Sequence, residues 1–122
     1  AAFALPFLER LLYRSRRTPV TRVLVLTPTR ELAVQGHSMI EKLAEFTDIR
    51  VYMVIGGVKN QLQEVELRKK PDVVVATPGR MIDHLRNTPG VGLEGLEILV
   101  LAEAVRLLEM GFTEEVEELV KM

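Results

Sequence analysis

Four short runs rich in Val, Ile and Leu constrain the fold of this 122-residue chain most strongly. They span residues 22–26, 50–55, 72–76 and 97–101. Each run is almost continuously apolar, which is typical of strands that are covered on both faces. Segments with helical spacing separate the runs, and strands that alternate with helices form parallel sheets with right-handed crossovers. The sequence therefore predicts one α/β domain over residues 1–122, with a parallel sheet of about four strands between two layers of helices.

Apolar residues at helical spacing predict the positions of the helices. The apolar stripes are Leu32, Ile40, Leu43 and Phe46; Leu62, Val65 and Leu67; Met81, Ile82 and Leu85; and Val116, Leu119 and Val120. A further helix is expected at the start of the chain, through Phe7, Leu8, Leu11 and Leu12. Residues 87–95 contain Pro89 and three glycines, which predicts a surface loop.

The composition excludes several classes of protein. No apolar stretch approaches the roughly 20 residues of a membrane span. Because there is no cysteine, disulfides and thiolate metal sites are excluded. The formal net charge of -1 argues against tight non-specific binding of nucleic acid, although the arginines concentrate in the N-terminal half, an asymmetry that can mark a polyanion-facing side. The first six residues lack a basic leader, so we expect no signal peptide, and the chain starts as a fragment would.

The residues that follow the first three predicted strands have the chemistry of a phosphate-binding edge. They read Thr27-Pro28-Thr29-Arg30, Gly56-Gly57 and Thr77-Pro78-Gly79-Arg80. In a parallel α/β sheet, ligands bind at the carboxyl ends of the strands. Exposed N–H groups of helix N-termini, Thr hydroxyls and Arg guanidinium groups all donate to phosphate oxygens. Since nothing resembles a base-reading element, we expect contact with a nucleic-acid backbone.

Local structure also explains each of these features when it is taken singly. Thr29 has the chemistry of a helix cap and Pro28 that of a strand stop, while Gly56-Gly57 and residues 77–80 are ordinary turn sequences. Their occurrence after three successive strands is what favours a binding site. His37 and His84 are expected to be surface or partly packed residues on helices, and not ligands.

Four motifs together resemble, in order and spacing, those of the first RecA-like domain of DEAD-box RNA helicases. They are residues 28–33, Gly56-Gly57, residues 77–80 and residues 102–105, and the resemblance covers essentially the whole chain. Residues 80–85 and 106–112 are most similar to the nucleolar, ribosome-assembly branch of the family. The resemblance implies a nucleolar or nuclear location and a strand order of last, first, third, second. It also implies weak contact with single-stranded RNA, through Pro28, Thr29, Arg30, Gly56, Gly57, Thr77, Pro78, Gly79 and Arg80.

Two departures from the family pattern shape the functional expectation. The Gly-rich loop that holds ATP phosphates in the family has no counterpart, and Ala102 and Val105 replace the two Asp residues of the Asp-Glu-Ala-Asp motif, leaving Glu103 as a relic. We therefore expect no catalytic residue, no metal site and no binding of ATP or Mg²⁺, in an inactive, engineered or designed fragment that is not an enzyme. Burial of unpaired carboxylates is costly, so restoring both Asp residues is expected to lower the melting temperature.

Other interpretations stay open at this point. The chain could be a structural or design scaffold without a ligand, a residual ATPase or RNA helicase, or a small flavodoxin-like signalling or mononucleotide-binding domain. A signalling domain of this kind would carry an Asp cluster at its strand ends, which is missing here. The apolar run 97–101 is expected at a sheet edge, where strands recruit other chains. Self-association through this strand or through a swapped terminal element is therefore also predicted. No membrane partner is expected.

Overall fold

The β-branched runs form four parallel strands in the computed structural model, which describes residues 11–12, 19–57, 59–111, 114 and 117–119. The strands are β1 (Val23–Leu26), β2 (Val51–Val54), β3 (Val73–Ala76) and β4 (Ile98–Leu101). They form one sheet in the order β2-β3-β1-β4, in which Val23 of β1 is in register with Val73 and Ile98. Every predicted strand is found to within one residue at each end. The predicted α/β fold and the expected strand order are confirmed.

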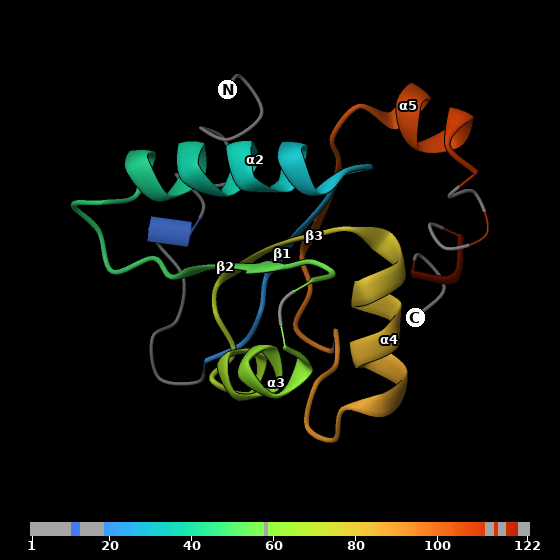
Figure 1. The fold of residues 1–122 in the computed structure, drawn as a ribbon. Coiled ribbons are helices and arrows are strands. Elements are labelled where there is room, and N and C mark those ends of the chain that lie inside the picture. The colour runs from blue at the N-terminus through green and yellow to red at the C-terminus, as the bar shows by residue number, and fades with distance from the viewer. Residues whose placement is uncertain (1–10, 13–18, 58, 112–113, 115–116, 120–122) are drawn as a thin grey trace.

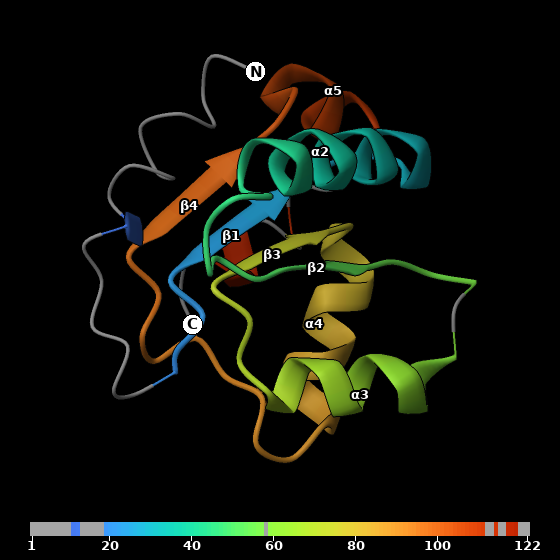
Figure 2. The same ribbon diagram turned by 90° about the vertical axis from the view of Figure 1, so that its left-hand side faces the viewer.

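Side chains alternate along the strands and divide the apolar core into two layers. Val23 and Val25 pack in one layer, with residues of α2 (Arg30–Leu43). Leu24 and Leu26 pack in the other, with residues of α3 (Asn60–Arg68) and α4 (Pro78–Asn87). Figure 1 and Figure 2 show α2 on one side of the sheet and α3 and α4 on the other. The central strands β1 and β3 are buried throughout, as their continuous apolar sequences require.

Two of the predicted helix faces are wrong in part. Phe46 lies beyond the end of α2 and is 94% exposed. On α3, Leu62 and Val65 are exposed, whereas Gln63 and Leu67 are buried. Successive helical residues are turned by about 100°, so Leu67 lies roughly 140° around the helix from Leu62 and only about 40° from Gln63. The helix therefore buries the face that carries Gln63.

Some predictions concern residues that the structure does not describe. The expected first helix lies outside the described residues except for Leu11 and Leu12, and the expected last helix is described only at its residues 114 and 117–119. Leu11 and Leu119 are both buried and belong to the two apolar layers. The predicted loop is confirmed, because residues 88–97 contain no helix or strand between α4 and β4. None of the helices formed by the described residues has the length and hydropathy needed to cross a membrane.

Candidate nucleic-acid interface

The segment after β1 brings Arg30 to the carboxyl edge of the sheet. The Thr27 amide still donates to the carbonyl of Ala76 on β3, at 2.9 Å, so the chain leaves the sheet only after this residue. Thr29 then has extended backbone, and its hydroxyl accepts a hydrogen bond from the Leu32 amide at 3.2 Å. Thr29 is therefore the N-cap of α2. Pro28 is buried, while Arg30, the first residue of the helix, is exposed.

The guanidinium group of Arg30 lies against Gly57, in the loop that follows β2. Gly57 has a φ of +85°, and a Cβ built on it would lie 3.1 Å from Arg30 Cζ. A side chain at this position would thus be strained and would also displace the arginine. In the part of the chain that the structure describes, no carboxylate pairs with Arg30. The structure therefore brings together the predicted residues of the first two strand ends.

The third predicted strand end is connected to the second through α3. Thr77 has the extended backbone of an N-cap, but its side chain makes no capping hydrogen bond, and Pro78 occupies the buried first turn of α4. Pro is well accommodated there because the first amides of a helix have no intrahelical acceptor. Gly79 is exposed, and a Cβ on it would meet no atom within 4 Å. Arg80 Nη1 donates to Asn60 Oδ1, on the first turn of α3.

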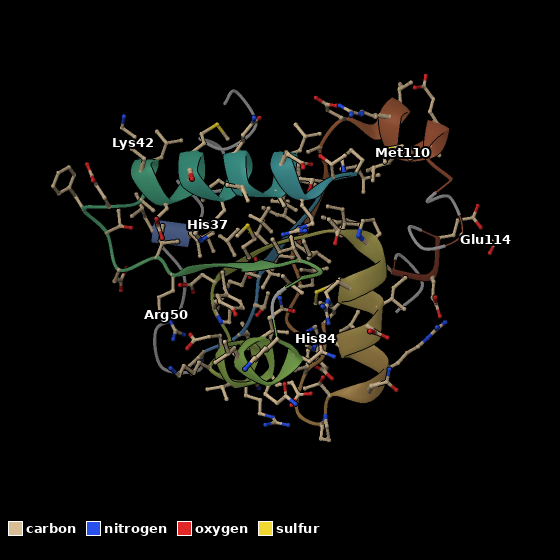
Figure 3. The ribbon with its side chains drawn as sticks, viewed as in Figure 1. His37, Lys42, Arg50, His84, Met110 and Glu114 are labelled. Carbon is tan, nitrogen blue, oxygen red and sulfur yellow. The ribbon has the colours of Figure 1, made fainter. Side chains whose placement is uncertain are left out.

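A buried hydrogen-bonded network, which the sequence did not reveal, lies between α3 and α4. Gln63 Nε2 donates to the carbonyl of Ile55 at 2.7 Å, and its Oε1 lies 2.9 Å from His84 Nε2. His84 Nδ1 lies 2.9 Å from the hydroxyl of Thr88. Figure 3 shows His84 between the two helices. The expectation that His84 is a surface or partly packed residue is wrong, because its exposed fraction is 2%.

The surroundings of His84 favour its neutral form. Burial lowers the pKa of its imidazole, and the charge of Arg80 acts in the same direction. The carboxylates of Glu64 and Asp83 act in the opposite direction, but the pKa still lies below its ordinary value. A neutral imidazole donates from one ring nitrogen and accepts at the other, which is what Gln63 and Thr88 require.

The end of β4 does not offer the ligands of a metal site. Ala102 and Val105 carry no side-chain oxygen, and the carboxylate of Glu103 lies 3.6 Å from Arg106 and is half exposed. In the described part of the chain, no group of three His, Cys, Asp or Glu side chains could hold a metal ion. These residues do not fit Mg²⁺, which binds through oxygen ligands. Val105 is also 69% exposed, so the argument that both replaced Asp positions are buried fails at this residue.

Comparisons with known proteins agree with the fold and the motifs. The family model of the DEAD/DEAH box helicases matches residues 1–122. The "DEAD-box ATP-dependent RNA helicase 28" of Oryza sativa subsp. japonica is 66% identical over 122 residues, which are 100% of this chain and 15% of the relative. The "ATP-dependent RNA helicase drs1" of Schizosaccharomyces pombe is 58% identical over 121 residues, or 99% of this chain and 16% of the relative. The chain thus spans about a sixth of the length of these relatives.

Solved structures show the same fold. The crystal structure of the yeast DEAD-box splicing factor Prp28 superposes with a TM-score of 0.90 at 30% identity, over 98% of this chain and 29% of that one. A hypothetical ATP-dependent RNA helicase from Sulfolobus tokodaii gives a TM-score of 0.84 at 36% identity, over 99% of this chain and 33% of that one. The expected RecA-like α/β fold is confirmed.

The same comparisons correct the expectation that the chain is not an enzyme. The relatives are named as ATP-dependent RNA helicases, which are enzymes. The expectation depended on the missing Gly-rich nucleotide loop and on two replaced side chains, Ala102 and Val105, and neither the fold nor the relatives show a loss of activity. The relatives also do not test whether these replacements were engineered, and that hypothesis stays a prediction.

Proposed function

Because the chain belongs to the DEAD/DEAH box helicase family, we propose that it supplies RNA-backbone contacts in the first helicase domain of an ATP-dependent RNA helicase. The nine residues expected to form the interface follow the first three strands, which end at one edge of the parallel sheet. The RNA is single-stranded, and it is contacted through its phosphates. Pro28 and Pro78, being buried, serve this interface by shaping the backbone and not by side-chain contact.

The observation that carries the proposal is the placement of Arg30 and Arg80 after two neighbouring strands. β1 and β3 pair directly, so α2, which begins at Arg30, and α4, which carries Arg80 in its first turn, start after neighbouring strands. Each arginine is held by the segment after β2: Arg30 lies against Gly57, and Arg80 donates to Asn60. Two cations beside two helix N-termini suit successive phosphates of a strand, because both the charges and the exposed amides attract anions. No base-reading element is needed for such contacts.

The test is fluorescence anisotropy with a labelled single-stranded RNA at low salt. The double variant Arg30→Ala and Arg80→Ala is compared with the double variant Lys42→Ala and Lys69→Ala. The control removes the same charge at the far ends of α2, where Figure 3 shows Lys42, and of α3, where Lys69 is the C-cap. We expect wild type and the lysine variant to bind weakly and alike, and the arginine variant to bind at least tenfold more weakly. Equal losses of affinity in both variants would show that the binding depends on net charge alone. If wild type does not bind, the scaffold interpretation holds instead.

The described residues contain no cluster of Mg²⁺ ligands, which leads to a separate expectation about cofactors. We propose that the described residues alone hold neither ATP nor Mg²⁺, because the end of β4 offers only Glu103. A fluorescent ATP analogue titrated with and without Mg²⁺ should show no saturable signal. A Mg²⁺-dependent signal that disappears in Glu103→Gln would contradict the proposal.

A second copy of the chain is the proposed partner of β4. In the described residues β4 pairs only with β1, so its other edge has no strand beside it. Leu101 at the end of β4, with Val105 and Leu108 on the helix that follows, have exposed fractions of 38%, 69% and 57%. An apolar edge strand of this kind recruits another strand. Light scattering should show dimers that Leu101→Lys dissociates, and a monomer across a wide concentration range would refute the proposal.

We propose a nucleolar location for the protein. The proposal is supported by the similarity of residues 80–85 to the nucleolar branch of the family and by the 58% identity with a drs1 helicase. Imaging of the tagged protein beside a nucleolar marker tests it, and a signal excluded from the nucleus would contradict it.

A further inference from the structure

We propose that Gln63, His84 and Thr88 are positioning residues, whose hydrogen-bonded chain fixes the Gly56-Gly57 loop at the edge where Arg30 and Arg80 lie. None of the three contacts RNA in this proposal, and they act through the loop backbone. The inference rests on the proposed RNA-backbone function, since it explains how that interface keeps its shape.

The direction of the hydrogen bonds among Gln63, His84 and Thr88 follows from one fixed acceptor. The carbonyl of Ile55 can only accept, so the Gln63 atom 2.7 Å away is the amide nitrogen. Gln63 therefore presents its oxygen to His84, whose Nε2 must carry the proton. In the neutral imidazole, His84 Nδ1 then accepts a hydrogen bond from the hydroxyl of Thr88. With a neutral imidazole, only one arrangement of protons satisfies all four groups, so every hydrogen bond in the network has a fixed direction.

The hydrogen-bonded network ends at Ile55, next to the proposed interface. Ile55 immediately precedes Gly56, and Gly57 is the residue against which Arg30 lies. Gln63 sits one helical turn after Asn60, on the same face of α3, and Asn60 holds Arg80. The same helix thus fixes the loop beside one arginine through the buried Gln63 and accepts a hydrogen bond from the other through the exposed Asn60.

Burial requires every polar group of the network to find its partner within the protein, since Gln63, His84 and Thr88 have exposed fractions of 0%, 2% and 5%. Removing one member leaves a buried donor or acceptor unpaired, which costs more than the hydrogen bond itself contributes. The unpaired group can regain a partner only by reaching water. The exposed segment beside it is the Gly57 loop, so we expect this loop to move when Gln63 is replaced.

The experiment compares Gln63→Leu with Gln61→Leu, the same substitution at an exposed position of the same helix. Thr88→Val is a nearly isosteric second variant that deletes only the hydroxyl, and Thr88→Ser restores it. The first readout is the set of amide chemical shifts and hydrogen-exchange rates of Gly56 and Gly57 in the free protein. The second is the nitrogen chemical shift of His84, which reports the protonated Nε2. The third is the affinity for labelled single-stranded RNA.

We expect Gln63→Leu to shift the Gly56 and Gly57 amides, to accelerate their exchange and to weaken RNA binding by about three- to tenfold. Gln61→Leu should change none of these, and Thr88→Ser should restore what Thr88→Val alters. If Gln63→Leu and Thr88→Val fold with wild-type loop signals and wild-type RNA affinity, the positioning role is refuted. If wild type binds no RNA, the proposed function fails, but the loop signals of the free protein still decide whether the network positions the loop.

Discussion

Gly57→Ala tests the geometry of the interface more sharply than any charge removal. The residue has a φ of +85°, and the added Cβ would lie 3.1 Å from Arg30 Cζ. A left-handed backbone costs an L-residue roughly 1–2 kcal/mol. The contact with Arg30 adds little, because the exposed end of that side chain can move aside. For a chain of this length, 1–2 kcal/mol corresponds to a melting temperature lowered by about 4–8 °C.

Gly56→Ala is the matched control for this substitution. Gly56 is the adjacent residue, has no positive φ, and a Cβ on it would meet no atom within 4 Å. Thermal unfolding followed by circular dichroism should therefore show a large loss for Gly57→Ala and a small one for Gly56→Ala. Displacement of Arg30 should also weaken RNA binding by Gly57→Ala beyond that by Gly56→Ala. Equal melting temperatures for the two variants would refute the assignment of the strained position.

Three further predictions follow from other parts of the fold. Gly36→Ala should stabilise α2 by about 0.5–1 kcal/mol and raise the melting temperature, because the new methyl would make an ordinary 3.8 Å contact with Val75; unchanged or reduced unfolding temperatures would refute this. Ala102→Asp should lower the melting temperature, because Ala102 packs against the apolar layer, whereas the exposed Val105→Asp should leave it nearly unchanged; equal losses would show that burial is not the cause. The pKa of His84 is lowered in the folded protein from its ordinary value of about 6.5. Below that pH the unfolded chain therefore binds more protons than the folded chain, so stability should be constant above pH 6.5 and fall below it. Denaturant midpoints at several pH values should show this slope for wild type and His37→Asn but not for His84→Asn.

The sheet could be predicted from the sequence because its strands are short, β-branched and nearly continuous in apolar residues. Val23 to Leu26 and Val73 to Ala76 are buried on both faces, so no alternation was needed to recognise them. Which face of each helix is buried was harder to predict from the sequence. On α3, Leu62 and Val65 mark an apolar stripe that the structure leaves exposed.

The candidate interface was predicted as motifs, but its supporting network was not. Gly57 and Arg80 could be found because they follow strands, where the topology places ligands. The contacts of Gln63 with His84 join residues that are 21 positions apart, on two different helices. Their only local signal was that Gln63 lies on the same helical face as Leu67. The exposure of Val105 was equally difficult to predict, since it depends on the direction in which α5 (Ala104–Glu109) leaves the sheet.

The salt dependence of RNA binding tests the central claim most directly. Each phosphate contact with single-stranded RNA contributes a slope of about -0.7 to a plot of log affinity against log salt concentration. If Arg30 and Arg80 each contact a phosphate, replacing both with Ala should make the slope shallower by about 1.4. The control with Lys42→Ala and Lys69→Ala should retain the wild-type slope. A slope that is the same in all three proteins would contradict the proposed interface.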